Sequence, residues 1–293
     1  MNSIGYLGPK GSFTEAAAKA LLPNHERIPF HSIPDSMDAV DEGEISAAVV
    51  PLENAIEGSV NVTLDYLIHH RRLNMSAEYT SPISQSLIIN HSNDIMKEIE
   101  YIYSHPQAVA QCHHFIRKNY PYAEIKYMNS TAAAAKYVSE HPEECAAAIA
   151  NELAAKEYRL SIVNSKINDY ENNSTRFILL QKDDNDQKLI RSSEKQKYKT
   201  TLMVTLPSDY SGALHQVLSA FAWRKINLSK IESRPMKTSL GDYFFIIDVE
   251  MALDEVLLPG ACDELKALGC GVSILGSYPC YEYINLPMTE KIK

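Results

Sequence analysis

The chain lacks the features that mark membrane, secreted and nucleic-acid-binding proteins. It has no apolar stretch of roughly 18 residues that could span a bilayer. Residues 1–7 contain no basic segment followed by an apolar run and a small-residue cleavage site, so we expect no signal peptide. The formal net charge of −9 leaves no wide basic face for a nucleic acid. We therefore expect a cytoplasmic protein with neither a nucleic acid nor a membrane as partner.

Cysteine is scarce and follows no pattern typical of disulfides or metal sites. The five cysteines are odd in number, irregularly spaced and free of any C-x-x-C pair, which is typical of reduced thiols in a cytosolic protein. His113 and His114 are adjacent and point to different faces of a helix, and residues 69–72 are typical of a solvated helix end. We expect no metal site. The cysteines are Cys112, Cys145, Cys262, Cys270 and Cys280.

The length and one charged segment predict the domain organisation. A chain of 293 residues is expected to form about two domains, and 45% hydrophobic with 22% charged residues is ordinary for globular protein. More than half of residues 182–199 are charged and the apolar periodicity vanishes there, which is typical of a linker. We therefore predict a first domain over residues 1–181 and a second over residues 200–280.

In the first domain, short apolar runs alternate with helical patterns, which predicts an α/β fold with parallel, helix-covered sheets. We expect one lobe from residues 1–79 and 163–181 and a second from residues 80–162, with a ligand cleft between them. The main elements expected are strands at residues 4–7, 47–50, 99–103, 125–128 and 146–150, and helices at 13–22, 60–71, 106–119 and from 131.

The second domain shows the order βαββαβ, which predicts a ferredoxin-like unit. Such a small sheet exposes an edge strand that often pairs with a second copy, so we expect oligomers through this domain. The expected strands cover residues 201–206, 227–233, 243–249 and 272–278, and the expected helices begin near residues 214 and 261.

Several helix starts in the first domain carry small polar residues. Ser12 and Glu15 have the spacing of a capping box, Pro106 stands at a first helical position, and Ser130 precedes an alanine-rich helix. Each signal alone favours a simple capping role. Several such helix starts at one end of a parallel sheet, however, bring unpaired N–H groups together where they can bind carboxylates.

A polar turn, Asn172-Asn173-Ser174-Thr175-Arg176-Phe177, leads directly into an apolar strand. An ordinary connection gains nothing from a hydroxyl beside a guanidinium, whereas a site that handles an oxygen leaving group and a carboxylate can use both. Taken alone, the segment also fits a solvated loop with a surface arginine. Cys112 lies on the apolar stripe of its helix and is expected in the core, not as a nucleophile.

Taken together, these segments resemble the prephenate dehydratase family over nearly the whole chain. The C-terminal part is similar to the ACT regulatory domain of that family. The matching segments are Gly5-Tyr6-Leu7-Gly8-Pro9-Lys10-Gly11-Ser12-Phe13-Thr14, Val50-Pro51-Leu52-Glu53-Asn54, Ser104-His105-Pro106-Gln107, Asn129-Ser130-Thr131, Thr175-Arg176-Phe177, Gly212-Ala213-Leu214 and Glu232-Ser233-Arg234-Pro235.

The resemblance implies a two-lobed catalytic domain of the periplasmic-binding type (type II) that converts prephenate to phenylpyruvate, with loss of CO2 and water and without a cofactor. It implies catalytic roles for Thr175, Asn54, Ser104 and Gln111, to which we add Arg176. A threonine hydroxyl is a poor acid, so Thr175 is expected to act as a positioned hydrogen-bond donor. As substrate-binding residues we expect Ser12, Thr14, Glu53, Ser130, Thr131 and Phe177.

For the ACT domain, the resemblance implies L-phenylalanine as an allosteric inhibitor in a homodimer or homotetramer. The expected effector-binding residues are Gly212, Ala213, Leu214, Asn227, Leu228, Glu232, Ser233, Arg234 and Pro235. Because no helical domain precedes residue 4, we expect a stand-alone dehydratase that is not fused to chorismate mutase. Two alternatives stay open: an arogenate dehydratase, which would use the same cleft, and a non-catalytic amino-acid-sensing binding protein.

Overall fold

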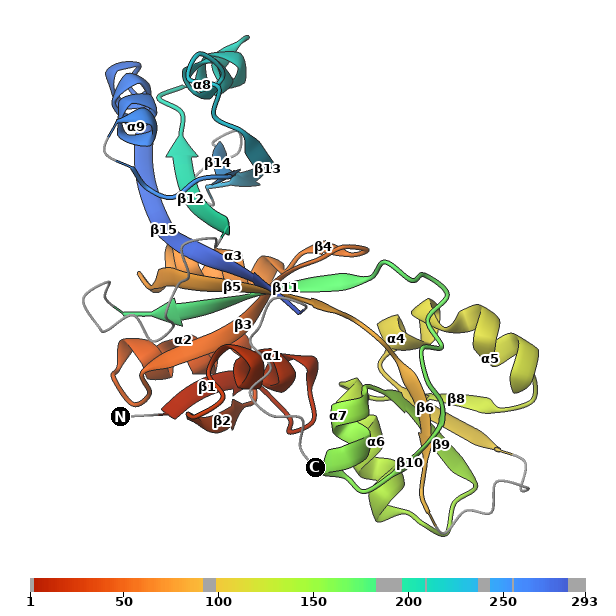
Figure 1. The fold of residues 1–293 in the computed structure, drawn as a ribbon. Helices are drawn as coiled ribbons and strands as arrows, with labels where there is room; N and C mark the ends of the chain where they lie inside the picture. The colour runs from red at the N-terminus through yellow and green to blue at the C-terminus, as the bar shows by residue number, and fades with distance from the viewer. Residues whose placement is uncertain are drawn as a thin grey trace. The chain divides into compact units, whose positions relative to one another are not determined.

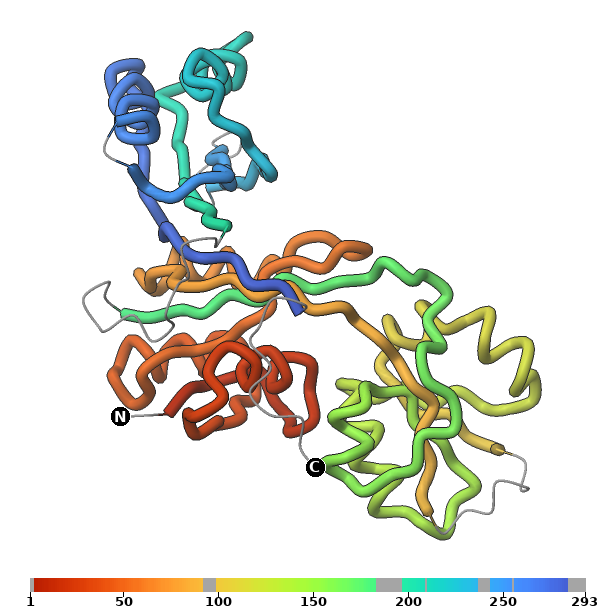
Figure 2. Tube along the Cα trace, in the orientation of Figure 1, coloured from red at the N-terminus to blue at the C-terminus, as the bar shows by residue number. Residues whose placement is uncertain are grey.

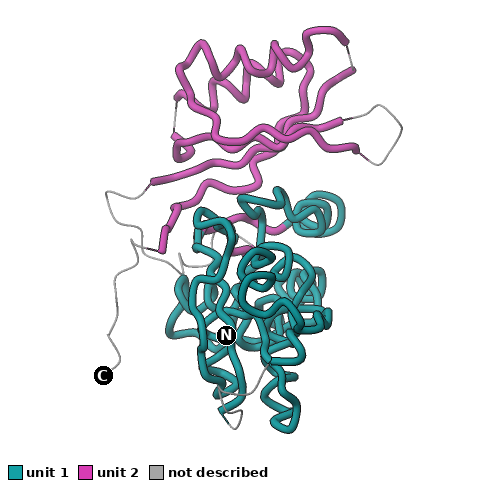
Figure 3. The backbone as a smooth tube through the Cα atoms, turned by 90° about the vertical axis from the view of Figure 1, so that its right-hand side faces the viewer, with its two compact units in different colours: residues 1–72, 79–178, 286–293 teal, residues 73–78, 179–285 magenta. Residues whose placement is uncertain are grey.

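The structure is a computed structural model that describes residues 3–91, 99–182, 197–208, 210–236, 243–254 and 256–283. These residues fall into two compact units (Figure 3). Unit 1 holds those in residues 3–72 and 79–178, and unit 2 holds those in residues 73–78 and 179–283. The division passes through two strands, β5 (Asn74–Pro82) and β11 (Ser174–Gln181).

The first lobe of unit 1 is built on a sheet with the order β5-β11-β3-β1-β2. Strand β1 pairs in parallel with both β2 and β3, and residues 47–50 of β3 are fully buried because helices cover the sheet (Figure 1). The elements are β1 (Ser3–Leu7), α1 (Phe13–Leu21), β2 (Glu26–Phe30), α2 (Ile33–Asp41), β3 (Ala47–Asn54), β4 (Gly58–Ser59) and α3 (Asn61–His69).

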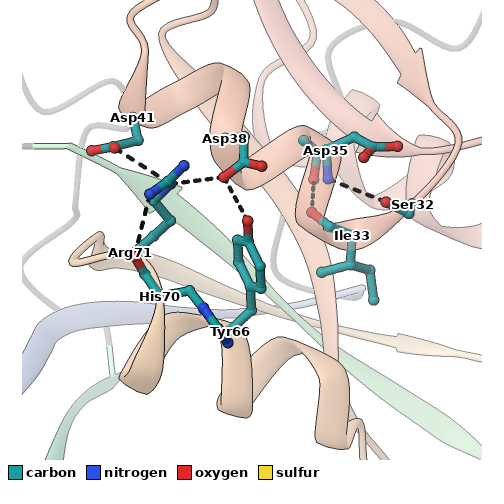
Figure 4. Close-up of polar contacts among 9 residues, drawn as sticks. Ser32, Ile33, Asp35, Asp38, Asp41, Tyr66, His70 and Arg71 are labelled. Carbon is teal, nitrogen blue, oxygen red and sulfur yellow. Dashed lines mark hydrogen bonds and ion pairs between the residues drawn. The ribbon is translucent and has the colours of Figure 1, made fainter.

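A polar cluster holds α2 against the end of α3 (Figure 4). One carboxylate oxygen of Asp38 accepts hydrogen bonds from Arg71 Nε and Tyr66 OH, both at 2.7 Å. The Arg71 guanidinium also lies 3.5 Å from Asp41, and the His70 ring stacks on Tyr66. Arg71 therefore joins this helix end to α2. His69, His70 and Arg72 are exposed, which agrees with the interpretation of residues 69–72 as a solvated helix end.

The second lobe of unit 1 contains a five-stranded sheet with the order β10-β6-β9-β7-β8. Strand β7 pairs in parallel with β8 and β9, while β6 pairs antiparallel with β9 and β10. The chain enters this lobe after β5 and leaves it before β11 (Figure 2). The elements are β6 (Ser86–Ile89), β7 (Tyr101–Ser104), α4 (Pro106–Gln111), α5 (His113–Asn119), β8 (Glu124–Tyr127), α6 (Thr131–Glu140), β9 (Ala146–Ala150), α7 (Glu152–Glu157) and β10 (Ser161–Asn164).

The single helix expected over residues 106–119 is wrong, because α4 and α5 are separate helices that meet at Cys112. Asp169 forms hydrogen bonds with the backbone groups at this break. Its N–H donates to the Gln111 carbonyl oxygen at 2.7 Å, and its carboxylate accepts from the His114 N–H at 3.0 Å. A residue distant in the sequence thus stabilises an interruption that the local apolar pattern does not show.

Unit 2 confirms the expected βαββαβ order, with an antiparallel sheet in the order β13-β14-β12-β15. Helices α8 and α9 lie side by side (Figure 1) and bury an apolar core against this sheet. The elements are β12 (Lys197–Thr205), α8 (Ala213–Ala222), β13 (Leu228–Pro235), β14 (Tyr243–Val249), α9 (Leu257–Ala267) and β15 (Gly271–Glu282).

The first strand of unit 2, β12, begins before the expected range of residues 200–280, and the last strand, β15, ends after it. Within the expected linker of residues 182–199, residues 183–196 lie outside the described part of the chain, and residues 197–199 belong to β12. The domain boundaries therefore stay a prediction. Among the described residues, no helix has the length and apolar character needed to cross a bilayer.

Candidate active site

Unit 1 contains a cavity of about 540 Å³ whose walls come from both of its lobes. A volume in this range accommodates a small organic ligand. Most of the residues that the sequence analysis assigned to the substrate site line it. These are Ser12, Thr14, Asn54, Gln111, Ser130, Thr131, Thr175 and Phe177. The side chains of Glu53, Ser104 and Arg176 are not part of its lining.

The Thr175 hydroxyl is held by the side-chain amide of Asn54. Asn54 Nδ2 donates to Thr175 Oγ1 at 2.9 Å. The orientation of this amide is fixed because Asn54 Oδ1 accepts from the backbone N–H groups of Ile56 and Glu57 at 3.0 and 3.2 Å. Since Thr175 Oγ1 already accepts a hydrogen bond, its own proton can be donated to a ligand in the cavity.

A second branch of hydrogen bonds links Asn54 to the facing lobe. Asn54 Nδ2 also donates to Asn173 Oδ1, and Asn173 Nδ2 donates to Gln111 Oε1 at 3.1 Å. Gln111 Nε2 in turn donates to Glu57 Oε1 at 3.3 Å, and Gln107 Nε2 donates to Glu57 Oε2. A continuous network therefore connects a carboxylate at the cavity wall with the Thr175 hydroxyl through side-chain amides.

Two helices begin at the cavity wall, and each is capped by a serine. Ser12 Oγ accepts from the Glu15 N–H at 3.1 Å, which confirms Ser12 as the cap of α1. The Glu15 carboxylate accepts from the Gly11 N–H at 2.6 Å rather than from the Ser12 N–H of a standard capping box. Ser130 Oγ accepts from the Ala133 N–H at 3.0 Å at the start of α6. The first turns of both helices present partial positive charge, which favours an anionic ligand.

Charged side chains are rare in the cavity lining. Among the residues that the structure describes, no lysine or arginine lines it, and Glu57 is its one acidic residue. An anion in the cavity is therefore met by helix starts, hydroxyl groups and side-chain amides rather than by an ion pair.

Arg176 lies outside the cavity lining although its neighbour Thr175 is part of it. Successive residues of a strand point to opposite faces, so the guanidinium is directed away from the hydroxyl. Arg176 Nη1 instead binds the Glu53 carboxylate at 2.6 Å, an ion pair in which both side chains are largely shielded from solvent. The expected direct contact of Arg176 and Glu53 with a ligand is therefore corrected to an ion pair beside the site.

Ser104 also differs from the expectation. Its side chain is fully buried, and its hydroxyl donates to the Ile149 carbonyl oxygen of the neighbouring strand at 2.7 Å. The cap of α4 is His105, whose Nδ1 accepts from the Gln107 N–H at 3.4 Å. We therefore assign Ser104 to the sheet below the site, and His105 is the residue of this pair that lines the cavity.

Cys112 is buried between α4 and α5 as expected. It is fully inaccessible, and burial raises the pKa of its thiol to about 12, with a smaller effect from the Asp169 carboxylate. A thiol with this pKa stays protonated at neutral pH and cannot act as a nucleophile.

Gln85 and Glu57 line the cavity, but the sequence analysis assigned neither to the site. It also gave no role to Asn173, which forms hydrogen bonds with the cavity residues Asn54 and Gln111. Gln85 is 3% exposed and lines the cavity from the segment that enters the second lobe. It stands between Ser84 and Ser86, just before the apolar residues 87–89, and no motif marked it. Asn173 lies in the polar turn that did attract attention, and two adjacent asparagines before a strand were the available signal.

The expected effector residues gather at two places in unit 2. Gly212 adopts a positive φ of 94° immediately before α8, and Leu214 on its first turn is 38% exposed. On β13, Arg234 Nη1 lies 2.8 Å from the Glu232 carboxylate, which also binds Lys230 at 3.1 Å. Strand β13 is at one end of the sheet order in this unit.

Comparison with known proteins identifies the family. Residues 4–185 match the family model described as prephenate dehydratase. The chain is 52% identical to a prephenate dehydratase of Bacillus subtilis (strain 168), with 95% of this chain and 99% of the relative covered. It is 44% identical to that of Lactococcus lactis subsp. cremoris (strain MG1363), with 95% and 98% covered.

A solved structure shows the same architecture. The prephenate dehydratase of Arthrobacter aurescens in complex with L-Phe matches with a TM-score of 0.81 and 34% identity, covering 94% of this chain and 89% of that one. The chain is similar to these proteins in sequence and in fold over nearly its full length, and residues of the family-like motifs line the cavity. The chain therefore belongs to the prephenate dehydratase family.

Proposed function

We propose that this chain converts prephenate to phenylpyruvate, with release of CO2 and water, as a step of L-phenylalanine biosynthesis. The observation that carries the proposal is the Thr175 hydroxyl in the cavity, whose oxygen accepts from Asn54 Nδ2 while its proton remains available to a ligand. The family membership of the chain supports the same activity.

The reaction breaks two bonds and forms an aromatic ring. The electron pair of the bond to the ring carboxylate moves into the ring as CO2 leaves, and the C–O bond across the ring breaks as hydroxide departs. Hydroxide is a poor leaving group, so a hydrogen bond donated to its oxygen stabilises the charge that develops there. Thr175 donates that hydrogen bond, and solvent supplies the proton that completes the water molecule.

Prephenate is a dianion, and the cavity offers neutral groups for both of its carboxylates. The starts of α1 and α6, with the hydroxyls of Thr14 and Thr131, supply donors and partial positive charge on two sides of the cavity. Phe177 presents an apolar surface beside Thr175 for the ring. A ring carboxylate held by neutral donors loses CO2 more readily than one fixed in a tight ion pair.

Arg176 and Glu53 act as positioning residues in this proposal. Their ion pair joins β11 to the end of β3, the strands that carry Thr175 and Asn54. Holding these strands together keeps the donor amide within hydrogen-bond distance of the hydroxyl.

Unit 2 is proposed to be an ACT regulatory domain that binds L-phenylalanine and lowers activity. Its ferredoxin-like topology and the exposed Leu214 beside the α8 start support this role, as does the L-Phe complex of the Arthrobacter relative. The end strand β13 supports pairing between copies in a homodimer or homotetramer. A cytoplasmic location is supported by five free thiols.

Incubation of the purified chain with prephenate tests the activity. We expect phenylpyruvate to form, and to form more slowly when L-phenylalanine is added. Arogenate in parallel samples tests the alternative substrate, whose product would be phenylalanine. No product from either compound, in a folded sample, would support a binding protein and refute the dehydratase.

A further inference from the structure

Glu57 is held over the cavity by a short hairpin. Strands β3 and β4 pair antiparallel through Glu53 with Ser59 and Asn54 with Gly58, and Gly58 turns the chain with a φ of 80°. The Asn54 side chain accepts the Glu57 N–H at the tip of this hairpin. The backbone of Glu57 is therefore fixed by groups other than its own side chain, which leaves its carboxylate free to reach across the cavity.

The carboxylate of Glu57 contacts the facing lobe through two glutamines. Gln107 and Gln111 lie one turn apart on α4, and each donates its amide Nε2 to one oxygen of the carboxylate. All three side chains line the cavity. This pair of parallel amide donors on one carboxylate is the arrangement expected for binding a carboxylate ligand.

The contact is placed where water can compete with it. Glu57 and Gln107 are exposed and Gln111 is half-buried. Hydrogen bonds in such a setting contribute little net free energy, so a ligand with better geometry can displace the glutamate. A ligand carboxylate and the Glu57 carboxylate cannot share the same donors, because the two negative charges repel each other at that distance.

We propose that Gln107 and Gln111 form a carboxylate subsite and that Glu57 occupies this subsite as an internal placeholder until a ligand carboxylate replaces it. The identity of the ligand as prephenate or its product rests on the proposed function, but the subsite itself rests on the contacts of Glu57. Glu57 thereby lowers the affinity for anionic ligands and bridges the two lobes of unit 1 through its contacts with Gln107 and Gln111.

The placeholder also connects the subsite with the reacting end of the cavity. Gln111 accepts from Asn173, which shares the Asn54 amide with Thr175. When a ligand carboxylate replaces the Glu57 carboxylate as the acceptor of Gln111 Nε2, the hydrogen-bond network of Gln111, Asn173 and Asn54 changes. The Thr175 hydroxyl, which this network positions, therefore responds to the arrival of a ligand carboxylate.

The substitution Glu57→Gln tests the proposal because it keeps the shape of the side chain and removes its charge. Calorimetry with phenylpyruvate, a carboxylate that does not react further, measures binding without turnover. We expect Glu57→Gln to bind phenylpyruvate at least fivefold more tightly and to lower KM for prephenate by a similar factor, while kcat changes less. Circular dichroism and Tm check that the variant is folded.

Glu124→Gln is the matched control. It removes the same charge from an exposed pair with Lys126 on β8 that does not line the cavity, so both affinities are expected to stay unchanged. Gln107→Ala is expected to weaken phenylpyruvate binding. In the Gln107→Ala protein, Glu57→Gln is expected to increase the affinity for phenylpyruvate less than in the wild-type protein. The reason is that Glu57 competes for the amide of Gln107, which the alanine substitution removes.

Unchanged or weaker phenylpyruvate binding by folded Glu57→Gln would overturn the placeholder, and so would an equal gain in Glu124→Gln. A loss confined to kcat would overturn it as well, since it would assign Glu57 to the chemical step. If the wild-type chain forms no phenylpyruvate but Glu57→Gln still binds it more tightly, the proposed function fails and the subsite stands.

Discussion

One side-chain amide decides in which direction the Thr175 hydroxyl donates. Asn54 can donate to Thr175 Oγ1 only because its carbonyl oxygen is engaged by two backbone N–H groups. The same amide both shapes the hairpin and orients the hydroxyl. The chemistry of the site therefore depends on the distinction between the two ends of a single amide group.

Asn54→Asp is expected to separate these two roles. The introduced carboxylate can still accept the N–H groups of Ile56 and Glu57, so the hairpin is retained. It accepts rather than donates at Thr175, so the hydroxyl proton is drawn away from the ligand, and we expect kcat for prephenate to fall about 10²- to 10³-fold. Steady-state kinetics with circular dichroism as the folding check measure this. A kcat within threefold of wild type would contradict the proposed orientation of Thr175.

Cys112 is expected to resist alkylation in the folded protein. Burial raises the pKa of its thiol to about 12, so at pH 8 it carries almost no thiolate. Mass spectrometry after iodoacetamide treatment should find Cys112 unmodified in native protein and modified in urea.

The raised pKa of Cys112 also makes the free energy of unfolding depend on pH. Above the ordinary thiol pKa of 9.0, the thiol ionises in the unfolded chain but keeps its proton in the folded chain, so the free energy of unfolding falls with rising pH. Rapid native alkylation would contradict the buried environment.

At this scale the sequence identified the reactive segment but not which of its residues face the cavity. The neighbouring hydroxyl and guanidinium of Thr175 and Arg176 marked the turn before any fold was known. Their separation onto opposite faces depends on how β11 sits beside β3, which is a property of the sheet. The pairing of Arg176 with Glu53, distant in the sequence, was likewise outside local patterns.

At the scale of elements, one loop of the first lobe contacts a helix of the second. Asn151 Nδ2 donates to the Gly11 carbonyl oxygen at 3.0 Å, and Tyr158 OH donates to the Lys10 carbonyl oxygen at 2.8 Å. Gly11 has a φ of 80°, and a Cβ there would lie 2.9 Å from Ala154 Cα. Only glycine satisfies both the backbone conformation and the close approach of α7.

Gly11→Ala is therefore expected to destabilise unit 1 and to raise KM for prephenate, since the loop must move away from α7. Gly43→Ala is the matched control: Gly43 has a φ of 76° with open space around it. The control is expected to cost about 1 to 2 kcal/mol from its backbone conformation alone, and Gly11→Ala more than that. Urea unfolding and steady-state kinetics measure both effects. Equal stability and equal KM in the two variants would contradict the lobe contact.

Apolar periodicity predicted most helices and strands because each of them buries one or both of its faces. It failed at Cys112, where the apolar stripe continues from α4 into α5 although the helix does not. The interruption depends on Asp169, which reaches the helix from the segment that returns to the first lobe. Apolar periodicity reports burial, and it carries no information on which distant residue forms hydrogen bonds with the backbone groups at the helix break.

At the scale of the whole molecule, unit 1 holds the candidate active site and unit 2 is the proposed regulatory domain. Binding of L-phenylalanine can lower activity only if it favours an arrangement of the protein that binds or converts prephenate less well. The sequence named this partnership through its resemblance to the family, because composition and periodicity cannot specify a substrate or an effector.

Leu214→Ala is expected to weaken inhibition by L-phenylalanine roughly tenfold while activity without the effector is retained. Leu214 lies on the first turn of α8, exposed and remote in sequence from every residue of the cavity lining. In the proposed effector site, removing the apolar surface of Leu214 reduces the contact with the ring of L-phenylalanine. Calorimetry gives the affinity, and prephenate turnover with increasing L-phenylalanine gives the inhibition constant. Unaltered inhibition would exclude Leu214 from the effector site.

The most direct test of the central claim is kcat on prephenate for Thr175→Ala, with Thr175→Ser measured beside it and phenylpyruvate affinity as the control for an intact cavity. The account predicts a loss of about 10² to 10⁴ in kcat for the alanine variant, or about 3 to 5 kcal/mol of transition-state stabilisation, and a much smaller loss for the serine variant. Near-wild-type turnover by a folded Thr175→Ala protein would contradict it.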